Sequence, residues 1–176
     1  LREFASVMKS ASYGRHEDLA TVIPKHYGLP GPLYFKNASA GMYTDFGDIR
    51  NVAGEVTSLI GDNPLILQIN TLGGNVMRPE FERASAFPHR SRPFLAELQT
   101  YYDRPSQEAA RLRAFREVQA TLRRNGVRHH YRNYPDLDLK DWEAAYYGAS
   151  YPRLQELKAR YDPEDLFRHP QSVRPK

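Results

Sequence analysis

The 176-residue sequence contains no cysteine, one tryptophan and three methionines. Because there is no thiol, the chain forms no disulfide, has no cysteine nucleophile and holds no zinc or iron–sulfur cluster through thiolates. No apolar run approaches the roughly 18 residues that a membrane span needs, which argues against an integral membrane protein. The first residues show no charged segment followed by an apolar one, so no targeting signal is visible.

Hydrophobic residues make up 40% of the sequence and charged residues 26%, a composition typical of a globular protein. The length corresponds to about one domain. The net charge of +4 is mild and by itself indicates no partner. Because the sequence begins at Leu1 rather than at a methionine, we expect it to be part of a longer polypeptide.

Apolar residues at helical spacing predict helices over residues 48–60, 106–125 and 151–161, and a weaker pattern predicts one over residues 16–26. The three clear segments end at stop signals, a glycine after the first two and an Asp-Pro pair after the third. These signals support the predicted ends of the helices.

Short apolar or alternating runs predict strands over residues 33–37, 65–71, 94–102 and 127–134. Strands and helices do not follow one another in a regular βαβ alternation. We therefore predict an α+β fold, in which an antiparallel β-sheet is covered on one face by α-helices.

The C-terminal third carries aromatic, proline and charged residues in a distinctive series. It reads Tyr131-Arg132-Asn133-Tyr134-Pro135-Asp136-Leu137-Asp138, Trp142, Tyr146-Tyr147-Gly148, Tyr151-Pro152-Arg153-Leu154, Lys158, Tyr161-Asp162-Pro163, Leu166-Phe167 and His169-Pro170-Gln171-Ser172-Val173. Upstream stand Gly73-Gly74 and Ala86-Phe87-Pro88-His89-Arg90. From about Tyr34 to Arg174, this sequence resembles the berberine-bridge-enzyme-like FAD-linked oxidases of the vanillyl-alcohol-oxidase superfamily.

The resemblance implies a substrate-binding domain in residues 1–130 and a berberine-bridge-like segment, helical and extended, in residues 131–176. Members of the family are longer and bind FAD mainly through an N-terminal domain that this sequence does not contain. The expected partners are that FAD-binding domain, on the same polypeptide or on a companion chain, and a small-molecule substrate. We expect the C-terminal segment to pack against the missing domain, and the 176 residues alone to be inactive.

The resemblance also implies a reaction. The family transfers a hydride to FAD from an alcohol, a carbohydrate or a natural-product C–H bond, and a general base that removes a hydroxyl proton assists such a transfer. In oligosaccharide-oxidase-like members the base is the second tyrosine of a Tyr-x-Asn-Tyr motif, which corresponds to Tyr134. On a regular strand Tyr134 shares a face with His130 and Arg132, two groups that favour a phenolate. The competing interpretations are a half-buried core position for Tyr134 and a solvent-facing one for Arg132.

Three residues are expected to bind substrate. Tyr131 lines the same pocket as Tyr134 if the chain bends, and Pro135 is well placed to cause a bend. By the resemblance, Asn70 occupies a position where some carbohydrate-oxidising relatives carry an aspartate, and Gln99 occupies a strand position that faces substrate. The competing interpretations are a strand-end cap for Asn70 and a solvent-facing polar side chain for Gln99.

The remaining polar motifs are assigned more modest roles. Asn133 is expected to contact the flavin, by its family position alone. His89 and Arg90 are expected to fix a loop by hydrogen bonding rather than to take part in catalysis. His129 and His130 are adjacent, so on a strand they point to opposite faces, and we expect no metal site.

A protein of a different class fits the sequence as well, namely an autonomous, non-catalytic module that keeps the fold and binds a ligand or a partner. The basic face of the helix predicted over residues 106–125 is expected to be solvated, because no nucleic-acid recognition motif accompanies it. We therefore expect neither a nucleic-acid nor a membrane partner. The colour of the purified protein separates the two classes, because a bound flavin is yellow.

Overall fold

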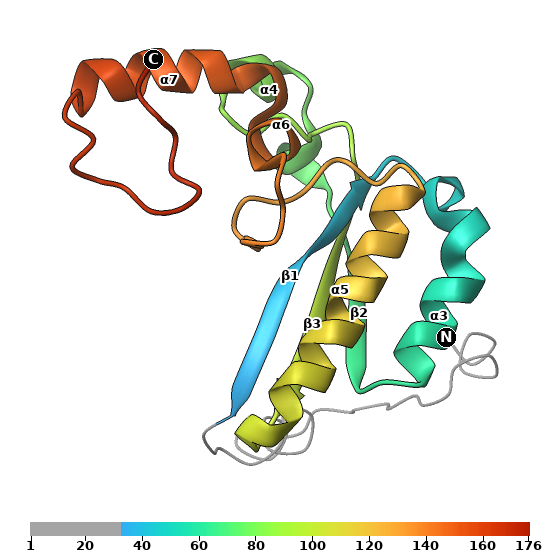
Figure 1. Ribbon diagram of the computed structural model, residues 1–176. Coiled ribbons are helices and arrows are strands. Elements are labelled where there is room, and N and C mark those ends of the chain that lie inside the picture. Colours follow the sequence, from blue (N-terminus) through green and yellow to red (C-terminus); the bar gives the residue numbers. More distant parts are fainter. Residues whose placement is uncertain (1–32) are drawn as a thin grey trace, which may run out of the picture. The chain divides into compact units, whose positions relative to one another are not determined.

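A computed structural model describes residues 33–176 of the chain (Figure 1). These residues cluster into one compact unit. The helix predicted over residues 16–26 lies outside the described residues. In the part that the structure describes, none of the helices combines the length and apolar character needed to cross a membrane.

Three antiparallel strands form a sheet in the order β1-β3-β2. The strands are β1 (Tyr34–Tyr43), β2 (Leu65–Thr71) and β3 (Phe94–Tyr102). β2 and β3 have the predicted bounds, and β1 continues well past its predicted end at residue 37.

Both helices predicted beside the sheet begin with a 3-10 turn and continue as an α-helix, and α7 has its predicted bounds. In chain order the helical elements are a 3-10 helix (Phe46–Val52), α3 (Ala53–Gly61), a 3-10 helix (Gly74–Met77), α4 (Glu80–Ala84), a 3-10 helix (Pro105–Gln107), α5 (Glu108–Arg124), α6 (Trp142–Tyr147), a 3-10 helix (Gly148–Ser150) and α7 (Tyr151–Tyr161). The short helices α4 and α6 were not predicted, because neither is long enough to show a clear period.

The core lies between the sheet and the pair α3 and α5, which pack beside each other on one face of the strands (Figure 1). Phe115, Val118 and Leu122 form the buried stripe of α5. They face strand residues such as Ala38 and Leu98, which are fully buried. Burial of each large side chain contributes about 1.5–3 kcal/mol, which fixes which face of the sheet the helices cover. The predicted α+β fold with helices on one face is confirmed.

The strand predicted over residues 127–134 does not form. This segment runs beside β1 and makes isolated hydrogen bonds to it, such as the one from the Ser39 N–H to the Tyr134 carbonyl. A regular ladder is interrupted because β1 bulges next to Gly41, which has a φ of 118°. A Cβ atom at Gly41 would lie 2.5 Å from a methyl group of Val127, so the glycine also permits the close approach of the segment.

The C-terminal segment packs against residues 136–139, which follow α5 in the chain. Gln171 is buried, and its Nε2 donates hydrogen bonds to the carbonyls of Asp136 (2.7 Å) and Leu139 (3.4 Å). Three apolar side chains of this segment remain largely exposed: Tyr161, Leu166 and Phe167. That the segment packs on an FAD-binding domain, and that a domain boundary falls at residue 130, stay predictions.

Candidate functional site

The face of the sheet that the helices leave open is largely polar. Residues that are paired across antiparallel strands point to the same side, and Glu97 is paired with Ser39 on one side and Gln68 on the other. The other members of this open face are Phe35, Asn37, Met42, Ile66, Asn70, Leu95, Gln99 and Tyr101. Asn70 and Gln99, which were predicted to bind substrate, thus lie on one surface.

A chain of hydrogen bonds connects these two residues. The Tyr101 hydroxyl donates to Gln99 Oε1 (2.9 Å), and Gln99 Nε2 donates to Gln68 Oε1 (3.4 Å). Gln68 Nε2 then donates to Asn70 Oδ1 (2.9 Å). Each amide can both donate and accept, so this row presents hydrogen-bonding groups of both kinds to a ligand.

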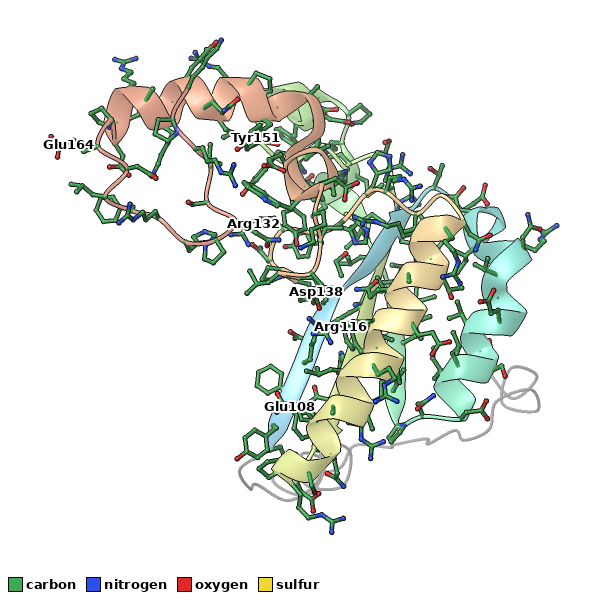
Figure 2. The ribbon with its side chains drawn as sticks, viewed as in Figure 1. Glu108, Arg116, Arg132, Asp138, Tyr151 and Glu164 are labelled. Carbon is green, nitrogen blue, oxygen red and sulfur yellow. The ribbon has the colours of Figure 1, made fainter. Side chains whose placement is uncertain are left out.

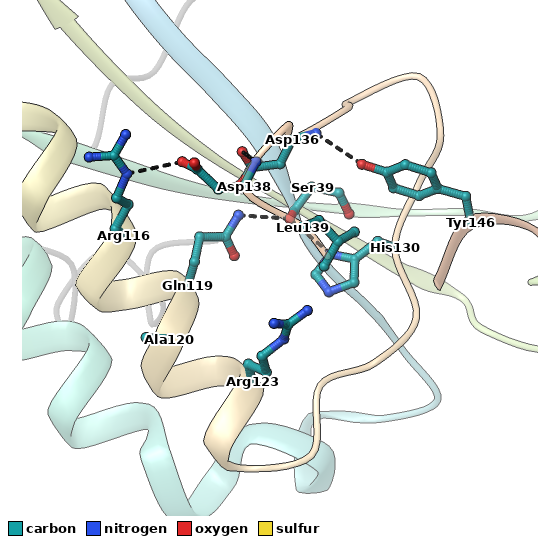
Figure 3. A pocket seen from close by; sticks show the side chains of 10 residues that line it. All are labelled: Ser39, Arg116, Gln119, Ala120, Arg123, His130, Asp136, Asp138, Leu139 and Tyr146. Carbon is teal, nitrogen blue, oxygen red and sulfur yellow. Dashed lines mark hydrogen bonds and ion pairs between the residues drawn. The ribbon is translucent and has the colours of Figure 1, made fainter. Parts of the chain in front are cut away.

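Ser39 holds the segment that contains the Tyr-x-Asn-Tyr motif. Its Oγ accepts a hydrogen bond from the Tyr131 N–H (3.0 Å), and its own N–H donates to the Tyr134 carbonyl (2.9 Å). Its carbonyl oxygen accepts from Gln119 Nε2 and His130 Nδ1, both at 3.0 Å. Ser39, Gln119 and His130 line a cavity whose volume is about 220 Å³. Figure 3 shows how these side chains lie around it. The position of the motif is therefore fixed at both of its ends.

The motif itself forms a turn, because the Tyr134 N–H donates to the Tyr131 carbonyl (3.1 Å). The turn brings the two tyrosine rings into edge-to-face contact, with centroids 5.3 Å apart. Asn133 is exposed, and its Nδ2 donates to the Tyr131 hydroxyl (3.0 Å). The bend required for Tyr131 and Tyr134 to meet is thus present, although it precedes Pro135.

The predicted role of His130 and Arg132 in favouring a Tyr134 phenolate is wrong. His130 is buried and bonded to β1. Arg132 turns toward the C-terminal segment, where it donates to the Tyr147 hydroxyl (3.0 Å) and lies 3.1 Å from His169 Nε2 (Figure 2). The prediction assumed the side-chain alternation of a regular strand, and the turn removes that alternation.

The Tyr134 side chain is half-buried, and its surroundings raise the pKa of the phenol above the ordinary value of 10.0. Burial is the largest cause, and the charge of Glu97 and the neighbouring Tyr131 act in the same direction. Glu97 is 6% exposed, and its Oε1 accepts a hydrogen bond from Asn37 Nδ2 (2.9 Å). Tyr134 therefore lies beside this part of the sheet, because its carbonyl accepts a hydrogen bond from the N–H of Ser39, the residue paired with Glu97.

A cavity of about 440 Å³ opens beside this turn. Tyr131 and Asn133 line it, together with Leu95 from the open face and Phe87 from the loop before β3. Its lining is mainly apolar and aromatic with a few polar groups, which is the usual composition of a small-molecule site. Tyr134 is not one of the lining residues, but its ring contacts that of Tyr131, which is.

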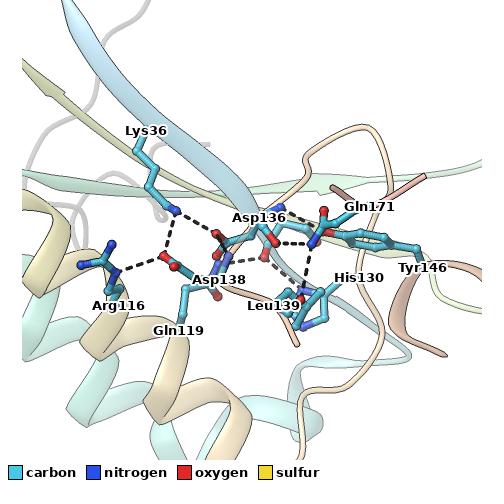
Figure 4. A network of polar contacts seen from close by, with 10 residues as sticks. Lys36, Arg116, Gln119, His130, Asp136, Asp138, Leu139, Tyr146 and Gln171 are labelled. Carbon is cyan, nitrogen blue, oxygen red and sulfur yellow. Dashed lines mark hydrogen bonds and ion pairs between the residues drawn. The ribbon is translucent and has the colours of Figure 1, made fainter. Parts of the chain in front are cut away.

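A network of charged groups holds the chain that follows the Tyr131–Tyr134 turn (Figure 4). Lys36 Nζ lies 2.7 Å from Asp136 and 3.2 Å from Asp138, and Arg116 of α5 lies 3.0 Å from Asp138. The Asp136 N–H donates to the Tyr146 hydroxyl (2.9 Å). Arg116 and then Lys36 lower the pKa of the Asp138 carboxyl. The chain just after Tyr134 is thereby tied to β1, α5 and α6.

His89 and Arg90 have the structural role that was predicted. The His89 ring is 2% exposed, and its Nε2 donates to the Ala145 carbonyl (3.1 Å). Arg90 donates to the Val76 carbonyl (2.7 Å) and to Ser85 Oγ (3.1 Å). Burial, reinforced by neighbouring charge, lowers the pKa of His89 to about 4. Among the described residues there is no group of three side chains suited to a metal ion.

The polar members of the site that were assigned no role from the sequence include Asn37, Ser39, Gln68, Glu97 and Tyr101. A signal for Glu97 was present, because it shares a strand face with Leu95 and Gln99 and is the charged residue of that run. The partners of Glu97 come from other parts of the chain. The pairing of β1 with β3 brings these partners next to Glu97, and the sequence does not specify that strand order.

Comparison with known proteins identifies a family. Residues 130–174 match the family described as berberine and berberine like. The FAD-linked oxidoreductase YvdP of Bacillus subtilis is 38% identical over 104 residues, which are 58% of this chain and 23% of that protein. The monolignol oxidoreductase AtBBE-like 13 of Arabidopsis thaliana is 34% identical over 168 residues, 85% of this chain and 31% of that protein.

The fold matches as well. The structure of CrmK, a flavoenzyme involved in shunt product recycling in caerulomycin biosynthesis, superimposes with a TM-score of 0.66 at 27% identity. The match covers 82% of this chain and 32% of CrmK. The chain therefore spans a third or less of the length of each of these three proteins.

Proposed function

Since the chain belongs to the berberine-bridge-enzyme-like family of FAD-linked oxidoreductases, we propose that it forms the substrate-facing part of an FAD-dependent oxidoreductase. The substrate is a small molecule with a hydroxyl-bearing carbon, of the alcohol, carbohydrate or natural-product class. Tyr134 is the general base. The FAD is held mainly by polypeptide outside these 176 residues.

The observation that carries this proposal is the position of the Tyr134 side chain. Its half-buried ring contacts that of Tyr131, which lines the cavity beside the open face of the sheet. A core tyrosine would instead bury its ring among the apolar residues between the sheet and the helices. The half-buried position leaves the phenol accessible to a substrate that lies on the open face.

The groups around the cavity suit the ring system of a flavin. Asn133 is exposed and, besides its bond to Tyr131, keeps a second amide hydrogen and a carbonyl oxygen for the polar edge of the ring. Phe87 and Tyr131 offer aromatic surface to a flat ligand. FAD, when bound, supplies the acceptor for the hydride that leaves the substrate carbon.

The chain's own residues bind the substrate and move its proton. Gln99, Gln68 and Asn70 present donors and acceptors to substrate hydroxyl groups, and Tyr131 covers an apolar part of the substrate. Tyr134 accepts the proton of the reacting hydroxyl, which places negative charge on that oxygen and assists departure of the hydride. The turn and its Ser39 anchor hold the phenol in position for this transfer.

The test uses the protein with all the polypeptide that accompanies this chain. Cellobiose, coniferyl alcohol and benzyl alcohol are mixed anaerobically with it, and bleaching of the flavin absorption is followed by stopped flow. We expect at least one alcohol to reduce the flavin, and Tyr134→Phe to slow that step by about 100-fold or more. Protein without flavin would favour a non-catalytic binding module, and an unchanged rate in Tyr134→Phe would remove Tyr134 from the mechanism.

A further inference from the structure

The cavity of about 440 Å³ beside the Tyr131–Tyr134 turn is lined by two arginines, Arg90 and Arg132, both half-buried. None of the described residues that line it is an aspartate or a glutamate. Neither arginine forms an ion pair with an acid in residues 33–176. Because a guanidinium stays charged at ordinary pH, the cavity carries two positive charges and no negative charge to balance them.

The rest of the lining strengthens the effect of these charges. Apart from the two arginines and Asn133, each lining side chain is apolar or aromatic. Electrostatic attraction is stronger where such side chains exclude water. A cation beside an apolar wall is costly unless a negative charge accompanies it. The cavity therefore favours a ligand that brings a negative charge.

Arg90 contributes its charge rather than direct contacts. Its Nη1 donates to the Val76 carbonyl (2.7 Å) and its Nη2 to Ser85 Oγ (3.1 Å), while Nε is buried. The guanidinium lies 5.5 Å from the ring centroid of Phe87, a favourable cation–π distance. The Arg90 side chain is thus held in the wall of the cavity, and its charge acts on a ligand from there.

Arg132 has donors that the protein does not use. Its Nε donates to the Tyr147 hydroxyl (3.0 Å), and its Nη1 has no partner in the described part of the chain. Its Nη2 lies 3.1 Å from His169 Nε2, but the N–H of Gln171 lies 3.2 Å from Nδ1 of the same ring. A neutral imidazole accepts a hydrogen bond at only one of its nitrogens. The ring therefore satisfies only one of these two N–H groups.

The Nη1 and Nη2 atoms of an arginine form a planar fork that binds a carboxylate through two parallel hydrogen bonds. The plane of this fork is held by the Nε bond to Tyr147 and by the Tyr146 ring, whose centroid lies 5.7 Å from the guanidinium carbon. Phe87 and Tyr131 offer aromatic surface in the same cavity. A flat ring that carries a carboxylate matches both features.

We propose that this cavity binds a carboxylate of the substrate through Arg132, with Arg90 adding its charge. The substrate is then an aromatic alcohol that also carries a carboxylate. This inference rests on the proposed function, because the hydroxyl of the same molecule has to reach Tyr134. The Tyr134 ring contacts that of Tyr131 in the cavity wall, with centroids 5.3 Å apart. Leu95 lines the cavity and belongs to the open face, so a ring in the cavity lies next to that face.

The flavin contact proposed for Asn133 is compatible with this role of Arg132. Asn133 is exposed and bonded to the Tyr131 hydroxyl, whereas Arg132 is bonded to the Tyr147 hydroxyl. The two neighbouring side chains thus have different partners. One of them can contact the flavin while the other binds the substrate.

The test uses the protein with all the polypeptide that accompanies this chain, and two substrates that differ in one group. Benzyl alcohol and 4-(hydroxymethyl)benzoate are compared in anaerobic flavin reduction over a range of concentrations. We expect the carboxylate to lower the concentration that gives half the maximal rate by at least about 10-fold. Arg132→Gln retains a hydrogen-bond donor and removes the charge, and we expect it to abolish this preference for the acid.

Arg153→Gln is the matched control, the same substitution at an exposed arginine of α7 that pairs with Glu156 (2.8 Å). The control is expected to keep the preference. A loss of packing affects the reduction by both substrates alike. The ratio between the two substrates is therefore a readout that a purely structural role of Arg132 would not change.

A second measurement needs neither turnover nor flavin. Benzoate and benzamide have the same ring and nearly the same shape, but only benzoate is charged at pH 7. We expect calorimetry to show that benzoate binds at least about 10-fold more tightly than benzamide to the unaltered protein and to Arg153→Gln. Arg132→Gln is expected to bind the two equally.

The outcomes separate this inference from the proposed function. Equal binding of benzoate and benzamide by the unaltered protein overturns the carboxylate site, whether or not Arg132→Gln folds. The site is also overturned if Arg132→Gln keeps the preference for the acid and lowers the reduction potential of the flavin, because Arg132 then faces the charge of the reduced flavin. If no alcohol reduces the flavin, or if Tyr134→Phe keeps its rate, the proposed function is overturned, and benzoate binding still decides the carboxylate site.

Discussion

The backbone N–H of Ser39 donates a hydrogen bond of 2.9 Å to the carbonyl of Tyr134, and Ser39 Oγ accepts one from the N–H of Tyr131. Ser39 is 2% exposed. Replacing it with alanine keeps its backbone N–H but removes Oγ, so the N–H of Tyr131 is left without its partner. We expect Ser39→Ala to lower the free energy of unfolding by about 1–3 kcal/mol, measured by urea denaturation. Ser58→Ala, on the exposed side of α3, is the control and should stay within about 0.5 kcal/mol. An equal loss in both variants would contradict the role of Ser39.

The contacts of Asp138 predict a loss of stability in acid. Arg116 and Lys36 lower its pKa in the folded protein, so its contribution is present above the unfolded pKa and is lost as the pH falls through the folded one. We expect the free energy of unfolding, measured by urea denaturation, to fall less between pH 7 and pH 3 in Asp138→Asn than in the unaltered protein. The difference is expected to be modest, because Asp138 is partly exposed and salt screens such pairs. An identical difference in both proteins would contradict this account.

His89 adds a second pH dependence, at higher pH. Its pKa is about 4 in the folded protein and 6.5 when unperturbed, so the unfolded chain binds the proton more readily. Its contribution to stability is therefore complete above pH 6.5 and falls by about 3 kcal/mol as the pH drops toward 4. We expect His89→Gln to unfold with a weaker pH dependence between pH 7 and pH 4. A His89 proton NMR titration with a midpoint near 6.5 in the folded protein would contradict the prediction.

Much of the architecture could be predicted from the sequence because its elements have local signals. A short apolar run before a glycine pair predicted the bounds of β2, alternation predicted those of β3, and helical spacing predicted those of α7. The segment 127–134 has the composition of a strand, but its conformation depends on Ser39 and Gly41, which are distant in sequence. A bulge in one segment thus decided the structure of another, and no pattern within residues 127–134 could indicate it.

Part of the candidate site could likewise be predicted from the sequence, and part of it could not. Asn70 and Gln99 were assigned to substrate by the family resemblance, and the structure places them on one sheet face and joins them through Gln68. The environment of Tyr134 was predicted with the wrong sign, because a regular strand would bring it cations and the turn brings it Glu97 instead. Charge next to a titrating group depends on tertiary contacts, which strand alternation alone does not provide.

Gln99 leads to a kinetic prediction. Its amide contributes hydrogen bonds to the substrate before and during the reaction alike, so its loss should weaken binding more than it slows the chemical step. We expect Gln99→Ala to raise KM by about 2- to 10-fold with a smaller change in kcat, in line with about 0.5–1.5 kcal/mol per hydrogen bond. Gln155→Ala, a matched change on α7, should leave both constants unaltered. A fall in kcat with constant KM would instead place Gln99 at the reacting atoms.

The open face also predicts how the 176 residues behave on their own. Phe35 is 61% exposed, Ile66 51% and Tyr101 43%, so this face ends in apolar side chains with no cover from the described part of the chain. A flavin that these residues contact on one side only buries little of its surface, and its affinity falls with the area that remains in water. We expect the isolated chain mixed with FAD to be colourless after gel filtration and inactive toward all three alcohols, whereas the complete protein is yellow. Retention of one flavin per isolated chain would contradict this, because it would mean that these residues alone enclose the cofactor.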